Sequence, residues 1–190
     1  MQYRSIDIKN AEDILQKMVN QEHNREFFRN VSERNGVKSV CDGCRAAVVL
    51  PEGVPDWHLH DAYFETGDET TPKFDLNTIF KNAKNNSFYF ELSKNQAEDF
   101  KTKLDLADDK IVSINIDKME IEKRETALES TNKPDERIIS FNPKYLKEAL
   151  NFIMCSDDEY IEIYYTGNDN PLVMKSSRLY ALILSVRLRE

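Results

Sequence analysis

The sequence predicts an α+β fold in which amphipathic helices lie on one face of antiparallel sheets. Three observations lead to this prediction. A strand, an amphipathic helix and two or three further strands recur in that order along the chain. Each predicted helix has a single apolar stripe and an opposite polar face that carries lysines. Several predicted strands alternate apolar and polar residues, and a sheet with one buried face can pack such helices side by side.

The first unit occupies the N-terminal segment. It begins with a strand over residues 3–8, and Asn10 is expected to cap the helix that follows. The apolar stripe of this helix comprises Ala11, Ile14, Leu15 and Met18. Asn35-Gly36 is a strong hairpin signal. It separates strands that are expected over residues 27–33 and 37–40, and a further strand is expected over residues 46–50.

A shorter unit is predicted over residues 74–86, with Ile79, Phe80 and Ala83 facing inward. The next unit starts with a strand over residues 88–92 and a helix that Ser93 caps. The inward positions of that helix are Ala97, Phe100 and Leu104. Strands follow over residues 112–117 and 119–121. The polar segments 52–72 and 126–135 are interpreted as loops.

The last unit is the clearest. A strand over residues 137–141 leads to Asn142, a favourable N-cap, and to Pro143, which suits the first helical position because its missing N–H costs nothing there. The helix has one apolar stripe, formed by Leu146, Ala149, Leu150 and Ile153. Three strands are expected after it, over residues 160–165, 172–175 and 179–188. We therefore predict two domains, 1–85 with an abbreviated second repeat and 86–190.

Composition restricts the class of protein. The chain has 190 residues and a net charge of −8, which argues against a protein coated in basic charge but permits one basic face. The longest apolar runs fall far short of a membrane span of about 18 residues. Residues 1–10 lack the apolar core of a signal peptide. Three cysteines do not suggest a disulfide framework, so a cytoplasmic location is expected.

Four segments resemble the bacterial DNA polymerase III beta subunit, the sliding clamp. Residues 141–150, Phe-Asn-Pro-Lys-Tyr-Leu-Lys-Glu-Ala-Leu, are similar to the start of the last repeat of that family. Residues 180–188, Tyr-Ala-Leu-Ile-Leu-Ser-Val-Arg-Leu, resemble its C-terminal strand, and residues 171–175 resemble the strand before it. Residues 40–47, Val-Cys-Asp-Gly-Cys-Arg-Ala-Ala, are similar to a strand end in its middle domain.

The resemblance implies a shortened clamp with the processivity fold. Members of the family have three domains and are about twice as long as this chain. Ser185 replaces the usual proline, and Cys41 and Cys44 replace threonine and histidine. The implied function is a DNA polymerase processivity factor, not an enzyme, that encircles duplex DNA without sequence specificity. The implied partners are peptides of the polymerase and the clamp loader and further copies of the chain, with no cofactor and no membrane.

The resemblance also implies two sets of site residues. Lysines on lumen-facing helices would meet phosphates, in an electrostatic contact that is blind to sequence. They are Lys17, Lys81, Lys84, Lys94, Lys101, Lys103, Lys144 and Lys147. A hydrophobic partner peptide would enter a C-terminal pocket. The pocket residues are Cys41, Gly43, Cys44, Arg45, Ala46, Tyr145, Leu184, Ser185, Val186 and Arg187. The ordinary alternatives are solvated helix faces and a strand that finishes a core.

Other functions remain open at this point. A tetrahedral zinc site could be formed by two thiolates and two imidazoles, those of Cys41, Cys44, His58 and His60, so a small zinc-binding interaction protein is an alternative. The single residue between the two histidines is atypical of a structural zinc finger. A clamp-derived regulator or decoy could bind replication partners without encircling DNA. The sequence has no phosphate-binding glycine loop and no serine elbow, so catalysis is not expected.

Overall fold

A computed structural model describes residues 6–19, 26–54, 56–64, 74–85, 88–107, 110–116, 118–122, 138–165 and 171–186. The helices of this part of the chain are α1 (Ile8–Met18), α2 (Leu76–Asn85), α3 (Lys94–Leu106) and α5 (Pro143–Ile153). Two 3₁₀ turns accompany them, η1 (Glu26–Arg29) and η2 (Asp56–Asp61).

The strands form one large and two small antiparallel sheets. The large sheet has the order β1-β2-β3-β12-β11-β10-β6, the small ones β8-β7-β9 and β4-β5. The first strands are β1 (Ser32–Arg34), β2 (Val37–Cys41), β3 (Arg45–Val49), β4 (Tyr63–Phe64), β5 (Phe74–Asp75) and β6 (Phe88–Ser93). The others are β7 (Val112–Asn115), β8 (Glu120–Glu122), β9 (Ile138–Phe141), β10 (Tyr160–Tyr165), β11 (Leu172–Ser176) and β12 (Leu179–Ile183).

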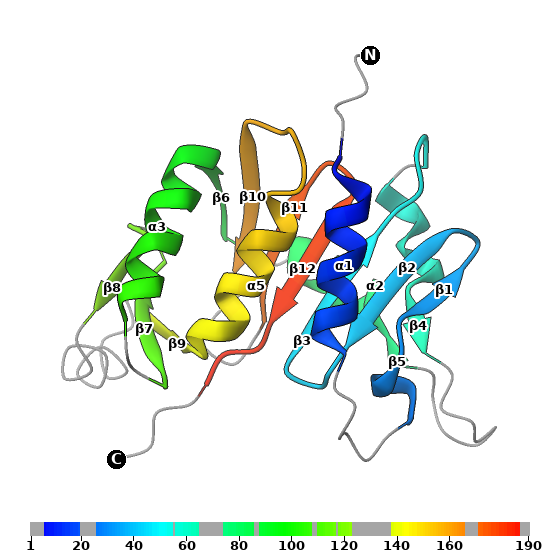
Figure 1. Cartoon of the computed structure of the whole chain (residues 1–190), viewed down its shortest axis with the longest axis horizontal. Coiled ribbons are helices and arrows are strands. Elements are labelled where there is room, and N and C mark those ends of the chain that lie inside the picture. Colours follow the sequence, from blue (N-terminus) through cyan, green and yellow to red (C-terminus); the bar gives the residue numbers. More distant parts are fainter. Residues whose placement is uncertain are drawn as a thin grey trace.

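The centre of the large sheet is buried on both faces. Alternate residues of β12 enter different cores: Leu179, Ala181 and Ile183 face the apolar stripes of α1, α3 and α5. Tyr180 and Leu182 face a second core, which includes residues of α2 and η2. Figure 1 shows α1, α3 and α5 in front of the large sheet, with α1 and α5 side by side, and α2 behind it. The predicted α+β class is therefore confirmed.

Helix α2 is the exception to the expected arrangement of helices on one face. Its buried residues Leu76, Phe80 and Ala83 pack in the second core, and the Phe80 ring lies edge-on to Tyr180, with 5.5 Å between the ring centroids. The predicted shorter unit therefore exists as a strand and a helix. It covers the opposite face of the sheet from α1, α3 and α5, and this positions its lysines away from theirs.

Two helix starts follow the expected capping chemistry. Asn142 accepts a hydrogen bond from the Lys144 N–H at 3.0 Å, and Pro143 is the first residue of α5. Ser93 and Gln96 form a reciprocal capping box at α3. The cap predicted for α1 is wrong: Asp7, not Asn10, is the N-cap, and its carboxylate accepts the Asn10 N–H at 3.1 Å.

Some expected strands differ in extent. The segment predicted as a strand over residues 27–33 contains η1 and only the start of β1. The loop predicted over residues 52–72 contains η2 and β4, and β12 ends at Ile183 instead of 188. The expected strand over residues 3–8 falls partly outside the described residues, and within them Ile6 forms an isolated bridge with Ser156.

The division into domains 1–85 and 86–190 stays a prediction. The boundary falls between α2 and β6, and the large sheet joins strands from both sides of it through the β3–β12 pair. The first core likewise draws on both parts. No helix in the described ranges is long and apolar enough to span a membrane.

Candidate functional site

The turn between β2 and β3 is organised by Asp42. Its carboxylate accepts the backbone N–H groups of Cys44 at 2.9 Å and Arg45 at 3.0 Å, and its own N–H donates to the Arg45 carbonyl at 3.1 Å. Gly43 has φ +89°, a conformation that favours glycine. An aspartate that bonds the backbone two and three residues ahead is a standard way to stabilise a tight turn.

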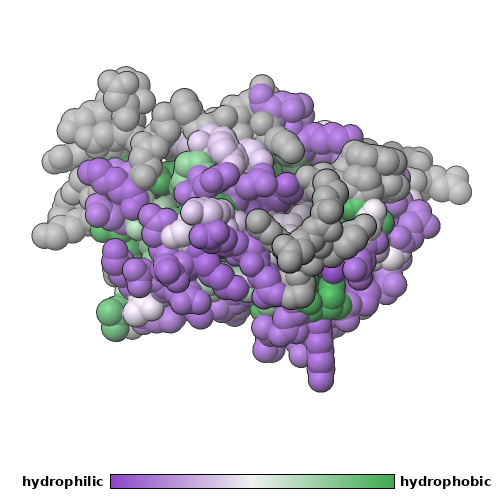
Figure 2. Space-filling view, turned by 90° about the horizontal axis from the view of Figure 1, so that it is seen from above, coloured by the Kyte–Doolittle hydropathy of each residue, from purple (hydrophilic) through white to green (hydrophobic). Residues whose placement is uncertain are grey.

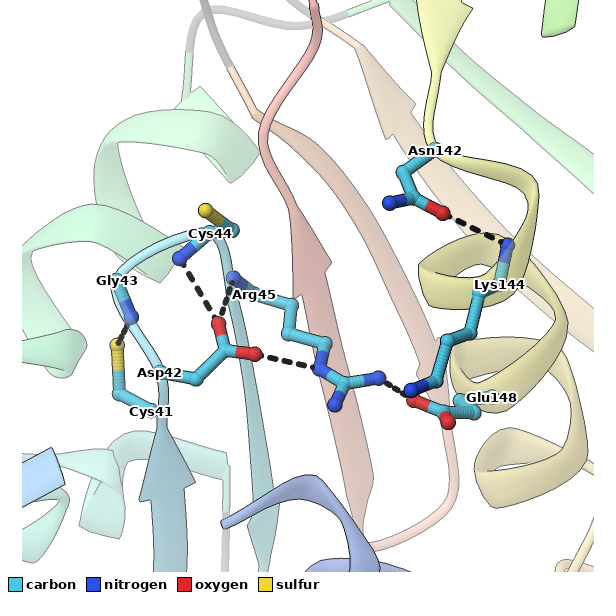
Figure 3. A network of polar contacts seen from close by, with 8 residues as sticks. All are labelled: Cys41, Asp42, Gly43, Cys44, Arg45, Asn142, Lys144 and Glu148. Atoms are coloured by element: carbon cyan, nitrogen blue, oxygen red, sulfur yellow. Dashed lines mark hydrogen bonds and ion pairs between the residues drawn. The ribbon is translucent and has the colours of Figure 1, made fainter. Parts of the chain in front are cut away.

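Arg45 connects this turn to α5. Its side chain is 5% exposed, and Nε donates to Asp42 Oδ2 at 2.9 Å. Nη1 forms an ion pair with Glu148, and the guanidinium carbon lies 4.4 Å from the centre of the Tyr145 ring. Figure 3 shows Arg45 extending from the turn to Glu148 on α5, with Asp42 bonded on the way. Both carboxylates and the ring thus hold the guanidinium in place.

The C-terminal segment meets the same end of the sheet. The Leu184 N–H donates to the Cys44 carbonyl at 2.8 Å, and the Val186 N–H donates to the Ser140 carbonyl at 2.7 Å. Leu184 is 43% exposed, and Ser185 and Val186 are half-buried. Cys44 is exposed beside them. Apolar side chains at the surface therefore gather where β3, β12 and the start of α5 converge.

Burial and negative charge raise the pKa values of the groups at this end of the sheet. Burial raises the pKa of the Cys41 thiol to about 12. The pKa of the Cys44 thiol is raised by partial burial and then by Asp42, while Arg45 opposes the shift. The pKa of Tyr145 is raised first by burial and then by Asp42 and Cys44, while Arg45 again opposes the shift. At neutral pH these groups are therefore uncharged, as suits a surface that accepts apolar side chains.

The structure brings most of the predicted pocket residues to one place, with different roles. Cys44, Tyr145, Leu184, Ser185 and Val186 lie at the surface or are half-buried. Cys41 and Ala46 are buried in the second core, and Arg45 is engaged by its partners, so these three support the site from beneath. Arg187 lies outside the described residues.

Six of the predicted DNA-facing lysines share one side of the large sheet. Lys17 on α1, Lys103 on α3 and Lys144 on α5 are exposed. Lys94 and Lys147 are half-buried: Lys94 donates to the Ser156 carbonyl at 3.0 Å, and Lys147 pairs with Asp105 at 3.1 Å. The sixth is Lys101, which is also half-buried.

Lys81 and Lys84 differ from these six lysines in their place in the fold. They lie on α2, whose apolar residues pack against the opposite face of the sheet. Lys81 is exposed, and its helix lies on the other side of the sheet from Lys17, Lys103 and Lys144. The amphipathic pattern predicts α2 correctly as a helix. It does not predict the side of the sheet on which α2 lies.

The three helices on the shared side differ in charge from the chain as a whole. α1, α3 and α5 carry seven lysines and six carboxylates, whereas the whole chain has a net charge of −8. Two of the six carboxylates are paired with cations outside these helices: Glu12 with Lys38 at 2.6 Å and Glu148 with Arg45. On the face seen from above in Figure 2, hydrophilic side chains cover most of the described part, and hydrophobic ones form small separate areas.

The zinc alternative has no support from the described residues. They contain no group of three or more His, Cys, Asp or Glu side chains placed to hold a metal ion. Cys41 is buried in the second core, while Cys44 is exposed. His58 and His60 lie on η2, where His60 Nε2 is 3.4 Å from Asp61 Oδ2.

Sequence reasoning missed three residues of this region: Asp42, Glu148 and Ser140. Asp42 carried a recognisable signal, because Asp-Gly is a turn dipeptide and an aspartate there bonds its own backbone. Glu148 has no such signal, because nothing in the sequence pairs it with Arg45, from which it is separated by 103 positions in the numbering. Ser140 contributes only a backbone carbonyl, which has no sequence signature.

Comparisons with known proteins identify the fold. No family model matches the sequence, and no curated protein sequence does. Solved structures match at low identity. The Helicobacter pylori beta clamp bound to a DNA ligase peptide is 14% identical, with a TM-score of 0.61 over 97% of this chain and 64% of that chain. The DNA polymerase sliding clamp of Caulobacter crescentus is 14% identical, with a TM-score of 0.57 over 95% and 63%.

The sliding clamp of Bacillus subtilis extends the same picture. It is 16% identical, with a TM-score of 0.57 over 100% of this chain and 66% of that chain. This chain thus spans just under two thirds of the length of the clamps that it matches. From its described N-terminal helix to its last strand, the chain has the fold of the bacterial DNA polymerase III beta sliding clamps.

Proposed function

We propose that the chain acts as a clamp-like processivity factor, which holds duplex DNA without sequence specificity and binds partner peptides at its C-terminal end. One observation carries the proposal: α1, α3 and α5 lie on one face of a continuous sheet in the sliding-clamp fold. That arrangement presents a single wall of helices. A protein that slides along DNA needs such a wall, with no contact to base edges.

The charge on this wall suits a loose contact with phosphates. Seven lysines against six carboxylates give a weakly positive surface on an acidic chain. Three of those carboxylates, Glu12, Asp105 and Glu148, already have cationic partners. A strongly basic wall would hold DNA in place, whereas a weakly positive one permits movement. The acidic remainder of the chain disfavours DNA on other surfaces.

The peptide site is proposed at the C-terminal cluster, which consists of Cys44, Tyr145, Leu184, Ser185 and Val186. These residues combine exposed or half-buried apolar atoms with a rigid support, the Asp42–Arg45–Glu148 network. A preorganised apolar surface reduces the cost of ordering on binding. The Helicobacter pylori clamp binds a DNA ligase peptide, and we propose a short hydrophobic segment of a replication protein as the ligand here.

A double charge reversal tests the DNA contact. Lys17 and Lys144 are exposed and lie on different helices of the wall, α1 and α5. Lys17→Glu with Lys144→Glu should weaken binding to duplex DNA. It should also lower the slope of log affinity against log salt by about 2, since each phosphate contact contributes about 0.9. Lys147 is not substituted, because it pairs with Asp105. Loss of that pair could disturb the packing of the helices as well as the charge of the wall.

The matched control makes the same change of charge elsewhere. Lys110 and Lys118 are exposed and lie outside the helices, near β7 and β8. Lys110→Glu with Lys118→Glu should leave the salt slope unchanged. If both double variants lose affinity equally, net charge and not the helix wall governs binding, and the proposal is wrong.

A second candidate is a clamp-derived regulator that binds replication partners without encircling DNA. The observation that favours it is charge, because the helices of the wall carry seven lysines against six carboxylates and so attract phosphates only weakly. In this candidate the C-terminal cluster keeps its role, and the wall of helices has none. The same charge reversals would then have no effect on any DNA binding that remains.

A further inference from the structure

The large sheet ends at β6, which has a strand partner on one side only. β6 pairs with β10 over its whole length, from Phe88↔Tyr165 to Ser93↔Tyr160. It is the last strand in the order of the sheet, and within the described residues no strand lies beyond it. Figure 1 shows β6 at the end of the sheet away from α1. Its outer edge therefore presents backbone donors and acceptors that could accept another strand.

Beside this edge, the face opposite the helix wall carries exposed aromatic rings. Leu92 and Ile163 point into the first core, so the alternate positions point the other way. Tyr89 on β6 is 51% exposed and Tyr160 on β10 is 47% exposed. The Tyr89 ring lies 5.3 Å from that of Tyr164, which is buried. Helix α2 covers part of this face but leaves both outer rings accessible.

The same surface is negatively charged. Glu91 and Glu162 are directly opposite each other in the β6–β10 register, so two carboxylates stand on neighbouring strands. Lys175 pairs with Glu162 at 3.1 Å. Glu91 accepts a hydrogen bond from the Tyr89 hydroxyl at 2.5 Å, and among the described residues no cation pairs with it. The surface, which we call the β6 surface, is Tyr89, Glu91, Tyr160 and Glu162.

We infer that the β6 surface binds an extended, arginine- or lysine-bearing segment of another protein, which adds a strand to the β6 edge. Alternate side chains of an added strand fall on one face. Cationic side chains at those positions would stack on Tyr89 and Tyr160 and pair with Glu91. The backbone supplies general affinity, and the aromatic and acidic residues select positive charge. This surface is separate from both surfaces of the proposed function.

Charge and strand length disfavour a second copy of this chain as the occupant. If β6 paired with β6 of another copy, the two Glu91 carboxylates would lie on adjacent strands, and like charges that face each other across a strand pair are destabilising. The strand at the opposite edge, β1, has three residues against six in β6 and contains Glu33. Neither edge of a second copy matches the length and the charge of β6.

The experiment uses the full chain and synthetic probes. A labelled peptide of alternating arginine and threonine is titrated by fluorescence anisotropy at low salt. One control peptide has glutamine in place of arginine, and another has a central proline, which cannot complete a strand pairing. The arginine peptide should bind at least about tenfold more tightly than either control. The glutamine peptide tests the contribution of positive charge, and the proline peptide tests the contribution of strand addition. Equal binding of the proline peptide would overturn strand addition.

Variants of the protein locate the contact. Glu91→Lys should weaken the binding of the arginine peptide by about tenfold or more. Glu91→Gln, which preserves the shape of the side chain, should also weaken this binding. Glu98 is exposed on α3, across the sheet, so Glu98→Lys is the matched control and should bind as the parent does. Equal losses in Glu91→Lys and Glu98→Lys would overturn the inference. Thermal unfolding checks that each variant is folded.

Two further measurements complete the test. If Glu91→Lys changes the mass in sedimentation, the β6 edge contacts a second copy and the inference is wrong. The Lys17→Glu, Lys144→Glu variant should bind the arginine peptide as the parent does. This result separates the β6 surface from the DNA-binding wall, because either proposal can then fail without the other.

Discussion

Arg45 shows how one side chain can connect distant parts of this chain. It leaves the β2–β3 turn, pairs with Asp42 there, and reaches Glu148 and Tyr145 on α5. Because Arg45 and Asp42 are each 5% exposed, removing one partner leaves a charge in a poorly solvated place. Such a network contributes little net stability compared with apolar packing, but breaking it is costly.

A substitution of Asp42 tests this network. Asp42→Ala removes the partner of Arg45 Nε and the acceptor of two backbone N–H groups. We expect the free energy of unfolding to fall by about 3 kcal/mol, because a buried ion loses its partner. Urea unfolding at neutral pH measures the change. Asp13 is exposed on α1, so Asp13→Ala is the control and should stay within about 0.5 kcal/mol of the parent.

The role of Arg45 could not have been obtained from the sequence. The C-terminal motif and the Cys-Asp-Gly-Cys-Arg segment predicted that the turn, the tail and Tyr145 would meet, and the structure brings them together. The pattern placed Arg45 among the ligand-binding residues. Its burial depends on Glu148, and a pairing across that many residues has no local signal. If the Asp42 and Asp13 variants have equal free energies of unfolding, the network does not stabilise the fold, and Arg45 is better interpreted as a ligand-binding residue.

At the scale of elements, local chemistry predicted helices well and their positions less well. Asn142-Pro143 and Ser93 mark the starts of α5 and α3 because their caps depend only on neighbouring residues. The side of the sheet that α2 occupies is a tertiary property. A signal was nevertheless present: β3 and β12 are apolar at almost every position, which indicates strands covered on both faces. An apolar run of this kind requires a helix on each side.

The tail after β12 gives the prediction for this scale. Val186 is half-buried and its N–H bonds the Ser140 carbonyl, so the tail lies along the end of β9. Val186→Asp should weaken binding of a hydrophobic clamp-binding peptide, such as the DNA ligase peptide that the Helicobacter pylori clamp binds, by at least about tenfold. An aspartate would have to be desolvated under the peptide. Isothermal titration calorimetry measures the affinity.

Leu106 provides the control for this substitution. It is 83% exposed at the end of α3 and is not a member of the C-terminal cluster, so Leu106→Asp introduces the same charge at an apolar position outside the proposed peptide site. Its affinity for the peptide should match that of the parent. If Val186→Asp binds as well as Leu106→Asp does, the peptide site lies elsewhere on the molecule.

For the whole molecule, continuity of the large sheet is the main architectural fact. β3 and β12 join the two predicted domains in one sheet, and α1 and α5 pack side by side over that junction. The wall of helices is therefore a rigid surface rather than two pieces joined by a linker. The sequence predicted the repeated units and the wall. It did not predict that strands from both ends of the chain would pair at the centre.

Assembly decides between the two proposed functions. One chain spans just under two thirds of a clamp chain, and a wall of helices on one side of a sheet cannot enclose DNA by itself. A processivity factor built on this wall would need several copies to surround the DNA. We therefore expect a homo-oligomer whose mass, measured by sedimentation, is constant over a wide range of concentrations.

The protein should stay on a closed DNA circle in high salt and leave when the circle is cut, because topology, not affinity, would then retain it. A monomer at every concentration that treats circular and linear DNA alike would exclude encirclement. It would favour the regulator, in which the C-terminal cluster competes for the peptides of replication proteins.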